Sequence, residues 1–116
     1  MKYSDIQPLL ERDFNFNETL AVLKHNIKIF WSWGVSNIQL VEVDKQDKDY
    51  VKGLLLKVSA HRCKGYVLIT LAWDDTYTVN IINNRGVISD TYKDVYFDML
   101  VDVIDDRIER IGEYVD

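Results

Sequence analysis

Hydrophobic and polar residues alternate through the middle of the chain. Val67, Ile69, Leu71 and Trp73 fall on one face of an extended segment, and Tyr77, Val79 and Ile81 do the same in the next one. Side chains of a β-strand alternate between its two faces, and turn residues separate these short runs, so the pattern predicts an antiparallel β-meander. We expect four to five strands, placed near residues 36–44, 51–59, 66–73, 76–82 and 87–92.

The two faces of the predicted sheet differ in polarity. The face that carries Val67 and Ile69 should meet helices. The opposite face carries Leu68 and Ile82 beside several threonines, which makes it more apolar than a solvent-exposed sheet surface needs to be. We therefore expect the N-terminal arm or a second subunit to cover part of that face.

Two segments show helical periodicity. Asn15 followed by Glu18 resembles a capping box, and Gly34 is a typical residue after a helix end, so one helix is predicted over residues 17–34. A second, amphipathic helix is predicted over residues 94–115. Its expected apolar face consists of Tyr96, Phe97, Leu100, Val103, Ile104, Ile108 and Ile111.

Together these elements predict a single α+β domain over residues 1–116, a length common for one domain. An arm over residues 1–16 precedes the helix of residues 17–34, the β-meander of residues 36–92 and the C-terminal helix. Both helices are expected on one face of the sheet.

The first predicted helix also carries a second apolar stripe, made of Val22, Ile29 and Trp33. Two interpretations stand side by side. Apolar residues of the arm, such as Leu10 and Phe14, cover the stripe, or the stripe is an exposed patch for self-association.

Negative charge is concentrated at the C-terminal end of the chain. The net charge is -5, and residues 94–116 hold eight acids against two bases. This balance argues against direct nucleic-acid binding, which usually needs a surplus of Lys and Arg. The acidic helix face is either a solvated surface or a docking face for a basic partner, with carboxylates in place of DNA phosphates. Its candidate residues are Asp98, Asp102, Asp105, Asp106 and Glu109.

Five short stretches carry a resemblance to known sequences: residues 65–69, 74–77, 84–86, 93–96 and 100–105. In these stretches the chain resembles small uncharacterised proteins carried on mobile elements of gut Bacteroidetes. The resemblance implies a cytoplasmic accessory role, and it transfers no catalytic residue because no activity is known for that group.

The candidates for a thiol nucleophile or a metal site are Cys63, His61 and His25. A thiol dyad needs an orienting carboxylate. The obvious pair, Asp74 and Asp75, lies across the strand of residues 66–73, about 25 Å away at ~3.3 Å per residue. One cysteine and two histidines also lack a recognised zinc spacing. The usual enzyme motifs are absent, so we expect no catalytic residue, no metal and no cofactor.

Following the meander from turn to turn places charges of opposite sign at its two ends. The connections at residues 44–49, 74–75 and 90–94 form an acidic end, while His61, Arg62, Lys64 and Arg85 form a basic end. Arg62, Lys64 and Arg85, helped by neighbouring asparagine amides, are candidates for anion binding. The alternative is ordinary turn composition.

The sequence thus favours a non-enzymatic interaction or accessory protein that acts as a homo-oligomer. The alternatives are a small-anion binder that uses the basic turns and an acidic docking protein for a basic partner. No segment has the apolar length of a membrane span, and a single cysteine fits a reducing compartment, so a cytoplasmic location is expected.

Overall fold

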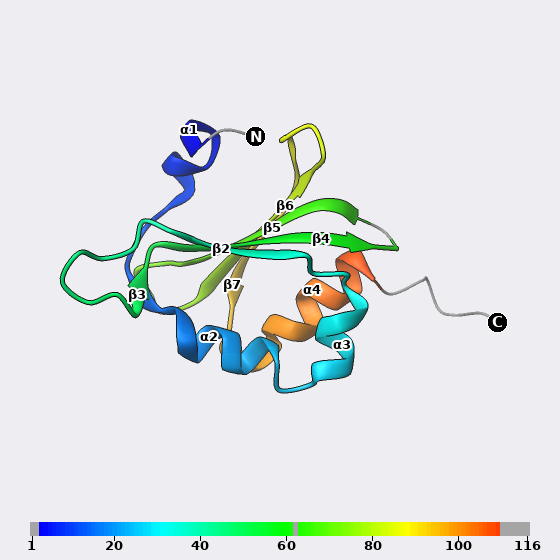
Figure 1. Ribbon diagram of the computed structural model, residues 1–116, viewed down its shortest axis with the longest axis horizontal. Coiled ribbons are helices and arrows are strands. Elements are labelled where there is room, and N and C mark those ends of the chain that lie inside the picture. The colour runs from blue at the N-terminus through cyan, green and yellow to red at the C-terminus, as the bar shows by residue number, and fades with distance from the viewer. Residues whose placement is uncertain (1–2, 62, 110–116) are drawn as a thin grey trace.

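The computed structural model describes residues 3–61 and 63–109 and has an α+β fold (Figure 1). Five strands form one antiparallel sheet in the order β2-β4-β5-β6-β7, and β1 pairs with β3 in a separate two-stranded sheet. The predicted α+β class and the antiparallel meander are confirmed. In chain order the elements are α1 (Tyr3–Ile6), η1 (Gln7–Leu9), β1 (Phe14–Asn15), α2 (Phe16–Leu23), α3 (Ile27–Ser32), β2 (Asn37–Val41), β3 (Tyr50–Val51), β4 (Gly53–Ala60), β5 (Cys63–Leu71), β6 (Tyr77–Asn83), β7 (Ile88–Val95), η2 (Phe97–Met99) and α4 (Leu100–Ile108).

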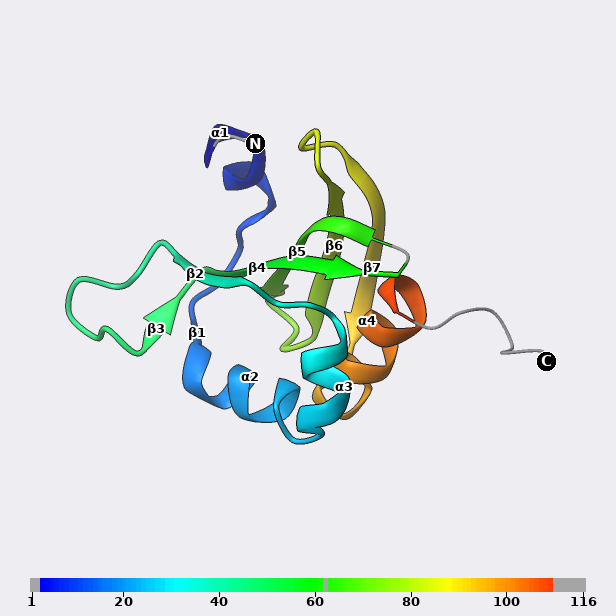
Figure 2. The same ribbon diagram turned by 45° about the vertical axis from the view of Figure 1, so that its right-hand side comes forward.

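One face of the sheet carries the main hydrophobic core. Val67, Ile69, Val79 and Ile81 are completely buried there against α2, α3 and α4, as the alternation predicts. Figures 1 and 2 show these helices on one side of the sheet and α1 on the other. Full burial of an aliphatic side chain contributes about 1.5–3 kcal/mol, so this interface is the main source of stability. Trp73 departs from the prediction and is 73% exposed, because β5 ends at Leu71.

The arm crosses to the other face of the sheet. Ile6 is buried with Leu55, Leu68 and Ile82 in a second, smaller cluster, to which Leu9 and Leu10 add partly buried side chains. The arm is thus one of the two covers expected for this face. Its later residues, Phe14 and Phe16, belong to the main core instead.

The predicted helix over residues 17–34 is two helices. Asn15 caps α2 as expected, because its side chain accepts hydrogen bonds from the backbone of Asn17 and Glu18. The chain then leaves the helix at Lys24, and the Asn26 side chain accepts from the backbone N–H of Ile29 at 3.4 Å to start α3. An asparagine that satisfies a helix-start N–H favours a new N-terminus over a continuous helix.

The burial of Trp33 shows that the predicted self-association stripe is wrong at this residue. Its side chain is 0% exposed and lies in the main core, so it cannot belong to an exposed patch. Val22 and Ile29 are partly buried against the same core. Phe14 and Phe16 of the arm belong to this core as well, whereas Ile6, Leu9 and Leu10 pack on the far sheet face. Only the end of the arm is therefore in the core that contains the stripe.

The C-terminal helix begins later than predicted. Strand β7 continues to Val95, which is buried and pairs with Tyr77, and α4 starts only at Leu100. Asp94, expected as the first helical residue, has φ 58° at an irregularity in the β6–β7 ladder.

This shift changes which apolar residues are buried. Leu100, Ile104 and Ile108 are completely buried, as predicted, since positions four apart share a helix face. Tyr96 and Phe97 were expected in the core but lie before the helix, and both are exposed. Ile111 lies outside the described residues.

Candidate functional site

The predicted acidic docking face is divided by the structure. Asp105 accepts a hydrogen bond from the indole Nε1 of Trp33 at 3.0 Å, and Glu109 accepts from His61. Both carboxylates are half-buried and hold α4 to its neighbours. Asp98 and Asp102 are exposed, and so is Asp106, which also makes an interaction of its own. The exposed acidic surface is therefore smaller than the sequence suggests.

His61 has the carboxylate that the sequence argument did not find. Glu109 Oε2 lies 3.0 Å from His61 Nδ1, and Glu109 Oε1 accepts from the His61 backbone N–H at 3.2 Å. Cys63 nevertheless lacks the character of a nucleophile. Burial raises the pKa of its thiol, and Arg107 offsets only part of that effect, so the thiol is protonated at neutral pH. The His61–Glu109 pair fastens the β4–β5 turn to α4.

Of the predicted anion-binding residues, Lys64 lies in strand β5, where it pairs with Ser59, and Arg85 lies in the β6–β7 turn near the same end of the sheet. Lys64 is exposed beside Gly65, which pairs with Asn83, and Arg85 is exposed in the β6–β7 turn. Asn83 Oδ1 accepts from the backbone of Arg85 and Val87, so this amide closes the turn. Arg62 lies outside the described residues, and anion binding remains a prediction.

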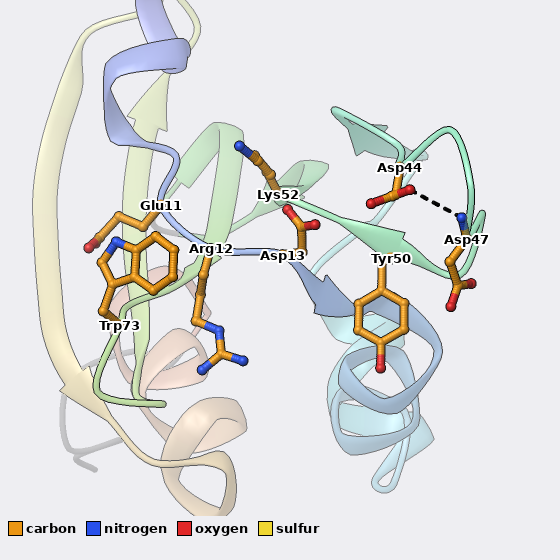
Figure 3. Close-up of a pocket in the computed structure, with 8 residues that line it drawn as sticks. All are labelled: Glu11, Arg12, Asp13, Asp44, Asp47, Tyr50, Lys52 and Trp73. Atoms are coloured by element: carbon orange, nitrogen blue, oxygen red, sulfur yellow. Dashed lines mark hydrogen bonds between the residues drawn. The ribbon is translucent and has the colours of Figure 1, made fainter.

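At the other end of the sheet the structure contains a cleft that the sequence did not reveal. We call it the arm cleft; it has a volume of about 600 Å³ (Figure 3). Three parts of the chain meet around it: the arm, the stretch from the β2–β3 connection through β3 to Lys52, and the segment after β5. Its lining consists of Glu11, Arg12, Asp13, Asp44, Asp47, Tyr50, Lys52 and Trp73.

Local hydrogen bonds shape the arm cleft. Arg12 forms an ion pair with Asp75, and its backbone bridges to Leu71 of β5. Asp44 accepts from the backbone N–H groups of Gln46 and Asp47 at 2.7 and 3.1 Å. These two bonds lower the pKa of Asp44 from its ordinary value, so its carboxylate is ionised at neutral pH.

Hydrogen bonds to an aspartate side chain also fix the turn that follows β5. Asp74 Oδ1 accepts from the backbone N–H of Thr76 at 3.1 Å and from its hydroxyl at 2.6 Å. Both bonds lower the pKa of Asp74, the one from the hydroxyl more strongly. Asp75 follows with φ 69°. This turn exposes Trp73 at the edge of the cleft.

A second hollow lies between two elements of the helical layer. We call it the helix groove; it has a volume of about 390 Å³ and is lined by Ala21, Val22, His25, Phe97 and Asp98. Phe97 is 66% exposed, and its neighbours Tyr96 and Met99 are exposed as well. Adjoining exposed apolar side chains of this size are unusual on a protein surface that has no partner.

Exposed charges of opposite sign lie close in the sequence to the residues that line the helix groove. Lys24 and Lys28 lie on either side of His25 in the sequence and are exposed. The Lys24 ammonium lies 5.7 Å from the centre of the Phe30 ring, which holds it at the end of α2. Asp98 and Asp102 are exposed on the η2–α4 side. We call Lys24 and Lys28 the basic bank and Asp98 and Asp102 the acidic bank. Of these four residues Asp98 lines the groove itself, and Lys24 lines a separate hollow with Phe30 and Trp31.

Two further findings concern metal-binding groups and membrane spans. Within residues 3–61 and 63–109, no group of three or more His, Cys, Asp or Glu side chains is placed to hold a metal ion. No helix in the same residues is long and apolar enough to span a membrane. Comparison with protein-family models, curated proteins and solved structures gives no match.

Proposed function

We propose that this protein is a non-enzymatic interaction protein that acts as a homodimer, with the helix groove as the contact between two copies. The observation that carries the proposal is the exposed run of Tyr96, Phe97 and Met99 beside a hollow lined by Ala21 and Val22. An interface needs such large apolar side chains next to a recess that can receive them.

The arrangement of charge favours a second copy as the occupant. In a dimer whose twofold axis runs along the groove, each bank of one groove faces the opposite bank of the other. Lys24 and Lys28 of one copy then meet Asp98 and Asp102 of its partner, and this pairing occurs twice. Opposed charges at the edge of an interface fix its register and disfavour other partners.

The experiment that tests this proposal measures mass by light scattering over a series of protein concentrations. The wild-type chain should approach twice the mass of one chain as concentration rises. Replacing the exposed ring by a charge in Phe97→Asp should raise the dimer dissociation constant at least about thirtyfold, the effect of losing roughly 2 kcal/mol at the centre of an interface.

The matched control is Val87→Asp, because Val87 is also an exposed apolar residue but belongs to the β6–β7 turn. This variant should dimerise as the wild type does. A wild-type chain that stays monomeric at all concentrations, or a dimer that Phe97→Asp leaves intact, contradicts the proposal.

The accessory role implied by the resemblance to mobile-element proteins is a further part of this proposal. A dimer without its own chemistry would act by bringing other molecules together. Cytoplasmic location and the absence of a cofactor remain predictions of the sequence.

A further inference from the structure

We propose that the arm cleft binds a basic peptide segment of a partner protein, with an arginine or lysine side chain held between carboxylates and aromatic rings. The arm cleft and the helix groove share no lining residue, so this inference does not rest on the dimer.

The charges of the cleft select a cation. Four of its lining residues are acids and two are bases, and one of those bases, Arg12, is already paired with Asp75. The carboxylates of Asp13 and Asp44 lie next to one another at the cleft (Figure 3). Neighbouring carboxylates repel, and a cation bound beside them offsets that repulsion.

The aromatic residues indicate which cation fits. Trp73 is 73% exposed and Tyr50 is also exposed, and they stand on opposite sides of the cleft (Figure 3). An exposed aromatic face attracts a guanidinium or ammonium group and packs against its aliphatic stem. Arginine satisfies both conditions, because its planar group stacks on a ring and donates to carboxylates at its edge.

The size and opening of the site favour a peptide over a metal ion. A volume of about 600 Å³ is far larger than a bare ion needs, and no metal-binding cluster exists among the described residues. The walls come from separate segments of the chain, which leaves a surface cleft suited to an extended segment.

The test is fluorescence anisotropy with three labelled peptides in which glycine alternates with arginine, glutamate or serine. The wild-type chain should bind the arginine peptide, bind it less tightly as salt rises, and not bind the other two. Trp73→Ala and Asp13→Asn should each weaken binding by roughly threefold to tenfold, the range expected for one cation–π or one charge contact.

Two controls separate the cleft from the general acidity of the protein. Trp31→Ala removes an aromatic ring that is 61% exposed on α3, and Glu18→Gln removes an exposed carboxylate on α2. Neither should change binding. Equal binding of the glutamate peptide, or equal losses in the control and cleft variants, overturns the inference. Thermal unfolding confirms that each variant is folded, and Phe97→Asp should bind the arginine peptide normally, which keeps this outcome separate from that of the dimer.

Discussion

The helix groove and the arm cleft are built from different parts of the fold. Each wall of the groove continues directly into the core: Leu23 follows Val22 and Leu100 follows Met99, and both leucines are completely buried. The walls of the cleft come from connections and from the arm, and ion pairs and turn hydrogen bonds hold them. Apolar packing thus fixes the groove, whereas backbone pairing, turn hydrogen bonds and one ion pair hold the walls of the cleft.

Because different interactions hold them, contacts at the groove and contacts at the cleft should respond to different solution conditions. Contacts that depend on apolar burial change little with salt, and exposed ionic contacts weaken as salt screens them. We expect core substitutions to alter the groove and changes of pH or salt to alter the cleft.

The largest expected effect is on the free energy of unfolding, which a substitution beneath the groove should lower far more than one at the cleft. Leu100→Ala should lower the free energy of unfolding by about 2–5 kcal/mol, because it opens a cavity beneath η2. Trp73→Ala, at the edge of the cleft, should change it by less than about 0.5 kcal/mol. Urea unfolding in the Phe97→Asp background, where dimerisation does not contribute, measures both. Similar losses in the two variants contradict the contrast between packed groove and surface cleft.

A smaller effect is expected at the contact that supports the helical layer. Trp33→Phe removes the Nε1 donor to the half-buried Asp105 and should cost about 1–3 kcal/mol of unfolding free energy. Trp31→Phe is the matched control, since Trp31 is largely exposed. If both substitutions cost the same, the hydrogen bond to α4 is not a stabilising feature.

The break between α2 and α3 positions His25 at the groove and predicts a further, smaller effect. Asn26→Ala removes the side-chain acceptor for Ile29 N–H and should cost about 0.5–2 kcal/mol. Asn26→Asp retains an acceptor and should be close to wild type. Chemical denaturation of both variants measures these free energies. An Asn26→Ala variant as stable as the wild type contradicts the view that the Asn26 side chain causes the break between α2 and α3.

The smallest expected effect concerns pH at the cleft. Asp44 and Asp74 have folded-state pKa values below those of the unfolded chain, so each stabilises its loop above the unfolded pKa. That contribution disappears as pH falls through the folded pKa, in the range below about 4. Amide NMR signals of Gln46, Asp47 and Thr76 should therefore shift on acidification, while Asp44→Asn abolishes the change near Gln46. Unchanged signals at all three residues argue against these carboxylates as loop stabilisers.

The sequence predicts the sheet better than it predicts the surfaces. Alternation placed Val67, Ile69, Val79 and Ile81 on the correct face because a strand with one buried face repeats a simple pattern. The end of β7 was less predictable, since Val95 continues the strand through a bulge that a regular period does not describe. Helix α4 begins at Leu100 instead of at residue 94, and this later start leaves Phe97 on the surface instead of in the expected core.

The two hollows were harder to predict for a physical reason. Each combines residues that are far apart in the chain, such as Val22 with Phe97 and Arg12 with Trp73. Periodicity describes one segment at a time and contains no information on which segments meet. The acidic end of the meander was the one signal for the cleft, because Asp44 and Asp47 belong to it.

The most direct test of the proposed dimer reverses the charge of one bank at a time. One variant carries Lys24→Glu and Lys28→Glu, and the other carries Asp98→Lys and Asp102→Lys. Twofold pairing places like charges opposite each other in either variant alone and opposite charges together in their mixture. Sedimentation equilibrium should therefore find monomers in each separate solution and dimers in the mixture. Dimers of each variant alone, or monomers in the mixture, would contradict the pairing of the two banks.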